Sequence, residues 1–218
     1  MDKLLSQCAD LVRELDPSMD RPIYLVGFDE IRDEDFAGPS NAIAWTSRTL
    51  DTELSDWLIE QGRWAGKGFA AIIHLDRCGS LQKTIGACLH EYAHYCDWGI
   101  AGDFDSPSER IAAVEMLHSW RPLLATAQDD ELALPRWVNH GQRFVRACCH
   151  LAHRTAYAVE SVRPGHLSFG SRYYGSQFTE ATWMQSLAAE LRSTGSIRDI
   201  LSTDPPIEFT ELFKEATC

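Results

Sequence analysis

A histidine, a glutamate and a second histidine stand close together in the arrangement His90-Glu91-x-x-His94. On a helix, residues four apart differ by about 400° of rotation and about 6 Å of rise, so both imidazoles lean over one face. Two imidazoles so placed are typical zinc ligands, and Glu91 then stands beside the ion rather than on it. A carboxylate there can take a proton from zinc-bound water, whose pKa the metal lowers to about 7, and pass it to a departing amine. The spacing therefore points to hydrolysis at a metal site.

The residues around this motif predict the elements that must present it. Apolar residues recur at helical spacing over residues 81–96, with Ser80 as a suitable N-cap and Gly99 as a plausible stop. Just upstream, the apolar run 68–75 predicts a short buried strand, followed by a turn at 76–79. In zinc hydrolases such a strand lines the cleft, and we expect its edge to be able to hold an extended peptide.

A catalytic zinc ion usually has three protein ligands and one open position, so a third ligand is required. An elongated motif with a histidine six residues further on is excluded, because an isoleucine stands there. A glutamate on a following helix some twenty residues on is a second option, and it leaves Glu109 and Glu115 open. The third candidate is His140, which is followed one turn later by Phe144, a side chain able to pack inward.

Together, segments 84–94 and 140–144 resemble the SprT-like and WLM-type zinc metallopeptidases. In those proteins a His-Glu-x-x-His helix is followed by a helix that opens with His-Gly-x-x-Phe. The resemblance covers about residues 66–155 and implies zinc on His90, His94 and His140, with Glu91 as the base. It also implies a zincin-like α+β domain, mostly helical, with a small sheet beside the motif helix. The chain departs from the pattern in a long gap before His140, which predicts an inserted helical segment at about 100–136 and keeps both glutamates in contention.

Composition favours one soluble domain over residues 1–218. The chain is 44% hydrophobic and 24% charged, and it has no apolar run of about twenty residues that could cross a bilayer. Its first fifteen residues alternate apolar and charged types at helical spacing and lack the apolar centre of a signal peptide. Seven cysteines without regular spacing favour buried thiols in a reducing compartment. We therefore expect a cytoplasmic protein without a membrane partner.

The formal net charge of −12 makes nucleic acid an unexpected partner, because binding to phosphates depends on clustered lysine and arginine. The DNA-linked role of some family members is therefore not carried over. The absence of a downstream Cys-x-x-Cys pair also disfavours that role. The arginines at 143, 146, 154 and 163 gather near the proposed third-ligand helix. They could face an acidic substrate, but a solvated helix face is the simpler interpretation.

Three other polar residues invite smaller predictions. Asp97 follows His94 by three positions, where it could accept a hydrogen bond from a ligand imidazole or be solvated. His150 and His153 are three apart, and we interpret them as helix-surface histidines rather than a second metal pair.

Elsewhere, hydrophobic periodicity predicts helices at about 3–15, 50–61 and 180–192, a strand at 22–28 and a helix after His140 that extends toward 161. A polar ending is expected around 204–206.

The function predicted from these residues is that of a zinc-dependent metallopeptidase acting on a protein or peptide substrate through zinc-bound water activated by Glu91. Two alternatives remain open: a non-catalytic, zinc-stabilised binding module, and a metal-dependent hydrolase of a non-peptide amide. A closed four-ligand site would favour the first, and a cleft too narrow for an extended chain would favour the second.

Overall fold

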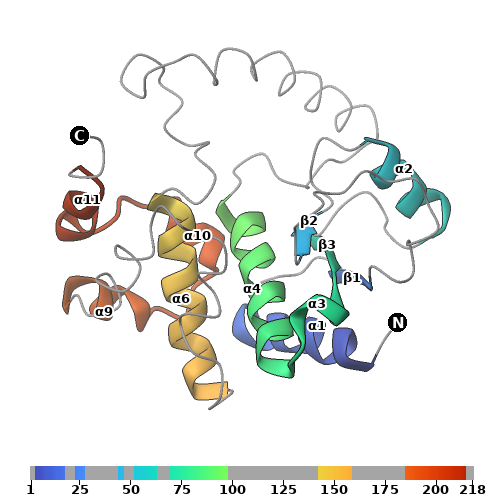
Figure 1. Ribbon diagram of the computed structural model, residues 1–218. Coiled ribbons are helices and arrows are strands. Elements are labelled where there is room, and N and C mark those ends of the chain that lie inside the picture. The colour runs from blue at the N-terminus through green and yellow to red at the C-terminus, as the bar shows by residue number, and fades with distance from the viewer. Residues whose placement is uncertain are drawn as a thin grey trace.

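The computed structural model describes residues 3–17, 23–27, 44–46, 52–62, 69–97, 142–158 and 185–214. Within these ranges the protein is mostly helical with a small sheet, an α+β arrangement (Figure 1). The first six elements in chain order are α1 (Lys3–Leu15), β1 (Ile23–Gly27), β2 (Ala44–Thr46), α2 (Thr52–Glu60), β3 (Phe69–Ile73) and α3 (Leu75–Cys78). They are followed by α4 (Leu81–Asp97), α6 (Gln142–Ala158), α9 (Gln185–Leu191), α10 (Ile197–Leu201) and α11 (Ile207–Lys214).

The strand expected before the motif helix is β3, and it is the central strand of the sheet. β1 pairs with it in parallel, with Ile23 opposite Phe69, and β2 pairs with it antiparallel on the other side. Residues 71–73 are at most 1% exposed, so both faces of β3 are covered, as a continuous apolar run predicts. The predicted strand is confirmed. The prediction that its edge is free for a peptide is wrong, because both edges already have partners.

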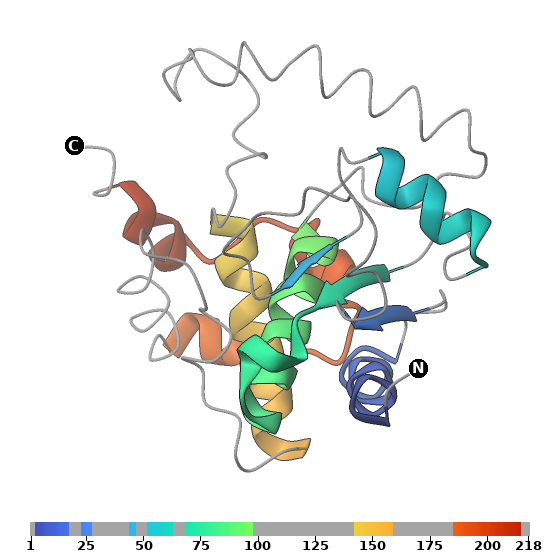
Figure 2. The same cartoon turned by 45° about the vertical axis from the view of Figure 1, so that its right-hand side comes forward.

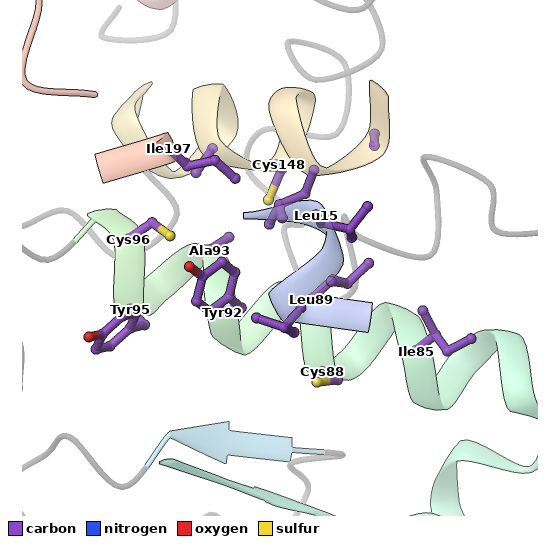
Figure 3. Packing of buried hydrophobic residues seen from close by; sticks show 14 of the residues in the cluster. Leu15, Ile85, Cys88, Leu89, Tyr92, Ala93, Tyr95, Cys96, Cys148 and Ile197 are labelled. Atoms are coloured by element: carbon purple, nitrogen blue, oxygen red, sulfur yellow. The ribbon is translucent and has the colours of Figure 1, made fainter. Parts of the chain in front are cut away.

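The motif helix α4 lies between the sheet and α6. It contacts β2 and β3 on one side and α6 on the other, and Figure 3 shows its labelled side chains pointing in both directions. Every residue from Thr84 to Asp97 is buried. A helix buried all round belongs to the interior of a protein, unlike an amphipathic surface helix. The elements around α4 therefore decide how its polar residues are placed.

The remaining helices enclose this centre. α1 packs against β1, α4 and α6, and Figure 2 shows it nearly end-on beside β1. α10 packs against α4 and α6, α9 packs against α6, and α11 packs against α9. The buried hydrophobic side chains of these elements form one cluster. None of the helices within the described ranges is both long and apolar enough to cross a membrane.

The start of α4 is fixed by local chemistry. Ser80 Oγ accepts a hydrogen bond from the Lys83 backbone N–H at 3.3 Å, which confirms Ser80 as the N-cap. The segment expected to be a simple turn is instead the one-turn helix α3, which Gly79 ends at a φ of 67°. That left-handed conformation suits glycine, and it lets the chain reverse from α3 into α4 within two residues.

Candidate metal centre

The three motif residues lie inside the protein. His90, Glu91 and His94 are each 7% exposed on the buried helix α4. An ionisable side chain in the interior costs free energy unless hydrogen bonds, an opposite charge or a metal ion compensates for the lost water. Three such groups within five residues therefore indicate a functional site more strongly than the same motif on a solvated helix would.

The two imidazoles meet as the helical spacing predicts. Their ring centroids are 4.9 Å apart, and the ring planes are nearly perpendicular, at 81°. Two imidazoles that share a tetrahedral zinc ion at about 2.0–2.1 Å have centroids about 5 Å apart. The separation of the two rings is therefore of the size that a shared ion requires.

Phe144, in the first turn of α6, packs against both imidazoles. Its ring centroid is 4.9 Å from that of His90 and 4.3 Å from that of His94, and the side chain is 1% exposed. The prediction that Phe144 packs inward is confirmed. Its contacts bring the beginning of α6, the element expected to follow a third ligand, directly against the two histidines.

The third ligand itself lies outside the described residues, as do all three of its candidates, His140, Glu109 and Glu115. The predicted insertion at about 100–136 and the expected helix end at Gly99 also fall there. Among the residues that the structure describes, no group of three or more His, Cys, Asp or Glu side chains is placed to hold a metal ion. Within that part of the chain, the donors that fit zinc are the two imidazoles, and a complete site requires a ligand from elsewhere.

Asp97 is neither solvated nor at the surface. Its side chain is 4% exposed, and Oδ1 accepts a 3.2 Å hydrogen bond from Arg143 Nε. The residue at the end of α4 is thereby joined to the second residue of α6. The structure gives Asp97 a role between helices that sequence spacing alone did not indicate.

The arginines of α6 were expected to form a solvated face. This expectation is wrong for Arg146 and Arg154, whose side chains are 2% and 12% exposed, whereas the Arg143 side chain is 31% exposed. Arg143, Arg146, His150 and Arg154 recur at helical spacing and form a basic stripe along α6. The C-terminal segment covers the stripe with carbonyl oxygens and one carboxylate. Arg154, for example, donates to the carbonyl oxygen of Gly195 at 2.6 Å, and it also donates to that of Leu15, at the end of α1, at 2.8 Å. The contacts of Arg146 and Arg154 are internal, so these two arginines are not positioned to face a substrate.

Glu190 is the carboxylate at the middle of the basic stripe. It accepts two hydrogen bonds from Arg146, at 2.9 and 2.6 Å, and lies 2.8 Å from His150 Nε2. Burial alone would raise the pKa of Glu190, but the bonds from Arg146 and His150 outweigh it and lower the pKa. His150 is fully buried, so its assignment as a surface histidine is also wrong. Burial lowers the pKa of His150, and the hydrogen bond to Glu190 opposes that shift only in part.

Asp16 is a buried polar residue that the sequence analysis did not single out. Its Oδ2 accepts hydrogen bonds from the Tyr92 hydroxyl at 2.9 Å and from the Ile197 backbone N–H at 3.3 Å. Its Oδ1 is 4.0 Å from Arg154 Nη1. One carboxylate thus links α1, α4, α6 and α10. No local pattern could have revealed this, because the partners are far apart in the sequence.

The described cysteines are free thiols, and all six are buried: Cys8, Cys78, Cys88, Cys96, Cys148 and Cys149. Burial raises the pKa of Cys148 and Cys149, so both remain protonated. A protonated, enclosed thiol is a poor zinc ligand and a poor nucleophile, which leaves the histidines as the candidate donors.

Comparison with known proteins adds no relative to this geometry, since no family model, curated protein or solved structure matches the chain.

Proposed function

We propose that the protein is a zinc-dependent metallopeptidase in which His90, His94 and His140 bind zinc and Glu91 is the general base. The observation that carries the proposal is the buried pair of imidazoles, 4.9 Å apart on α4, with Phe144 of α6 packed against both. The position of Phe144, the last residue of the His-Gly-x-x-Phe segment, thus supports the resemblance to SprT-like and WLM-type enzymes. On this proposal the domain is zincin-like and acts in the cytoplasm on a protein or peptide chain.

His140 is the preferred third ligand for a reason of chain connectivity. It precedes Gln142, the first residue of α6, by two positions. Two residues span at most about 7 Å, and Phe144 already brings the start of α6 against the imidazoles. Glu109 and Glu115 have no comparable tie to a described element next to the histidines.

When bound, zinc would lower the pKa of a coordinated water to about 7 and polarise the scissile carbonyl. The chain's own residues supply the rest of the chemistry. Glu91 takes the proton of the attacking water and delivers it to the leaving amine. The imidazoles of His90 and His94 would hold the ion, and Phe144, packed against both rings, restricts their rotation.

The test combines zinc content by elemental analysis with cleavage of a peptide library. We expect His140→Ala to lose zinc, Glu91→Gln to keep zinc but lose cleavage, and Glu109→Ala and Glu115→Ala to keep both. His153→Ala, which changes a partly buried histidine elsewhere on α6, is the matched control and should behave as the wild type. Zinc retained without His140 would refute the ligand assignment. A wild-type protein that holds zinc but cleaves no peptide would refute the peptidase and favour a zinc-stabilised binding module.

A further inference from the structure

The ion pair between Asp97 and Arg143 lies next to the candidate metal centre, at the C-terminal end of α4. Asp97 is the last residue of α4 and its side chain is 4% exposed, whereas the Arg143 side chain is 31% exposed. Arg143 Nε donates to Asp97 Oδ1 at 3.2 Å. The pair joins a buried carboxylate to a partly exposed guanidinium, and it holds the end of α4 against the start of α6.

The position of the pair relative to the proposed ligands is regular. Asp97 follows His94 by three residues, and Arg143 follows His140 by three residues. Figure 1 shows that the C-terminal end of α4 and the N-terminal end of α6 lie at the same end of the helix pair, with α10 beside them. The ion pair therefore joins the end of α4, about one helical turn beyond His94, to the start of α6.

A second contact fixes the guanidinium itself. Arg143 Nη1 donates to the carbonyl oxygen of Leu201, the last residue of α10. α10 packs against both α4 and α6, and the Arg198 guanidinium lies over the Tyr95 ring, 4.9 Å from its centroid. Arg143 is thus held between a carboxylate of α4 and a carbonyl of α10, and it cannot shift without breaking one of the two bonds.

We infer that Asp97 and Arg143 are positioning residues that set the distance between the start of α6 and the two histidines, and thereby set the affinity for zinc. The inference rests on the proposed function, because it assumes that His140 completes the site. Ligand distances in such sites are fixed to within about 0.2 Å, so a small displacement of one ligand-bearing element lowers the affinity for the metal. Changes in the contacts that orient zinc ligands typically cost about 10–100-fold in affinity.

The test measures the zinc dissociation constant by competition with a chromophoric chelator, for wild type, Asp97→Asn, Arg143→Lys and the double variant. We expect zinc binding to weaken about tenfold in each single variant. The double variant should lose no more than a single one, because both residues act through one bond. Visible absorption of the cobalt-substituted protein should change in the same variants, since it reports the coordination geometry directly.

The matched controls are Arg146→Lys and Glu190→Gln, which alter a different arginine–carboxylate pair, between α6 and α9. We expect these controls to lower the melting temperature of the apoprotein while they leave the zinc affinity and the cobalt spectrum as in the wild type. Equal loss of zinc affinity in controls and test variants would overturn the inference, because general destabilisation would then explain it. Wild-type affinity in Asp97→Asn would overturn it too. A wild-type protein that binds no zinc would instead refute the proposed function.

Discussion

The hydroxyl of Tyr92 donates a 2.9 Å hydrogen bond to Asp16 Oδ2, so a residue inside the motif helix is fastened to the end of α1. Burial, followed by the nearby acidic groups, raises the pKa of Tyr92, so the phenol remains a donor. Asp16 is 1% exposed and has lost its contact with water. The bond therefore joins two elements of the core, and its loss leaves a buried acceptor short of a donor.

Replacement of Tyr92 by phenylalanine removes the hydroxyl that donates to Asp16 and keeps the ring. We expect Tyr92→Phe to lower the free energy of unfolding by about 1–3 kcal/mol, the usual cost of a buried group that loses its partner. Urea denaturation followed by circular dichroism measures the change. Arg13→Ala, which removes the exposed pair between Arg13 and Asp10, is the control and should change the stability hardly at all. Equal effects of the two variants would contradict the role assigned to Tyr92.

The stability of the protein should depend on pH through His150. Burial lowers its pKa in the folded state below the ordinary value of 6.5, so the unfolded chain takes up a proton there first as the pH falls. Stability should therefore fall as the pH drops below about 6.5. The contribution of Glu190, whose folded-state pKa is lowered from 4.5, is present above that pH and is lost only in more acidic solution.

Unfolding of the apoprotein in urea, repeated between pH 7.5 and 5, measures this dependence. His150→Gln should flatten the curve below about pH 6.5, because the titrating group has been removed. The groups that face His150 are Glu190, Arg146 and Arg154, and all three remain in this variant. His153→Gln is the control: partial burial also lowers the pKa of His153, but a smaller change in slope is expected at this less buried position. An unchanged slope in His150→Gln would show that another group controls the titration.

Phe144 should matter for both stability and the metal. Phe144→Ala removes a fully buried ring and should cost about 3–5 kcal/mol, whereas Phe144→Leu keeps most of the volume and should cost under about 1.5 kcal/mol. Both variants remove the aromatic contact with the two imidazoles, so we expect both to weaken zinc binding.

The control for Phe144 is Phe209, a fully buried ring of α11. Phe209→Ala should lower the melting temperature as much as Phe144→Ala. Its zinc affinity, measured by competition with a chelator, should stay close to that of Phe209→Leu. If zinc affinity followed melting temperature alone across the four variants, Phe144 would have only a packing role.

The left-handed conformation of Gly79 makes a further prediction. Its φ of 67° is strained for any L residue, and so Gly79→Ala should destabilise the protein by about 1–2 kcal/mol although the space around it is open. Gly195 has an ordinary φ, and an added Cβ would meet only van der Waals contacts at 3.6 and 3.8 Å. Gly195→Ala should therefore be neutral or slightly stabilising by thermal melting. Equal destabilisation in the two variants would contradict this account of Gly79.

Local patterns predicted the elements well where hydrophobic periodicity extended over several turns or a whole strand. The helix expected at 3–15 is α1, the strand at 22–28 contains β1, and the helix at 50–61 contains α2. The short helices α10 and α11 were missed, because five and eight residues show too little periodicity and the polar run at 202–206 stands between them. α11 begins directly after two prolines, a signal for a helix start that the predicted polar ending overlooked.

In the candidate site, too, the residues placed by local spacing were predicted and those placed by distant partners were not. Spacing within one helix was enough to place His90 beside His94, because helical geometry fixes side chains four residues apart. The partners of Arg146 and Asp16 could not be predicted, since Glu190 and Ile197 lie 44 and 181 residues away. Arginine is usually solvated, so the basic stripe of α6 was assigned to the surface, and only the tertiary structure shows the segment that covers it.

The burial of α4 from Thr84 to Asp97 has a kinetic consequence. Local fraying exposes the ends and the surface elements of a protein, whereas a helix enclosed by a sheet and several other helices opens only with the whole core. The backbone amides at residues 89–93 should therefore be among the last to exchange with deuterium, at a rate set by global unfolding. Retention of the motif in its working geometry is then a property of the entire domain, and the lifetime of that geometry equals the lifetime of the folded state.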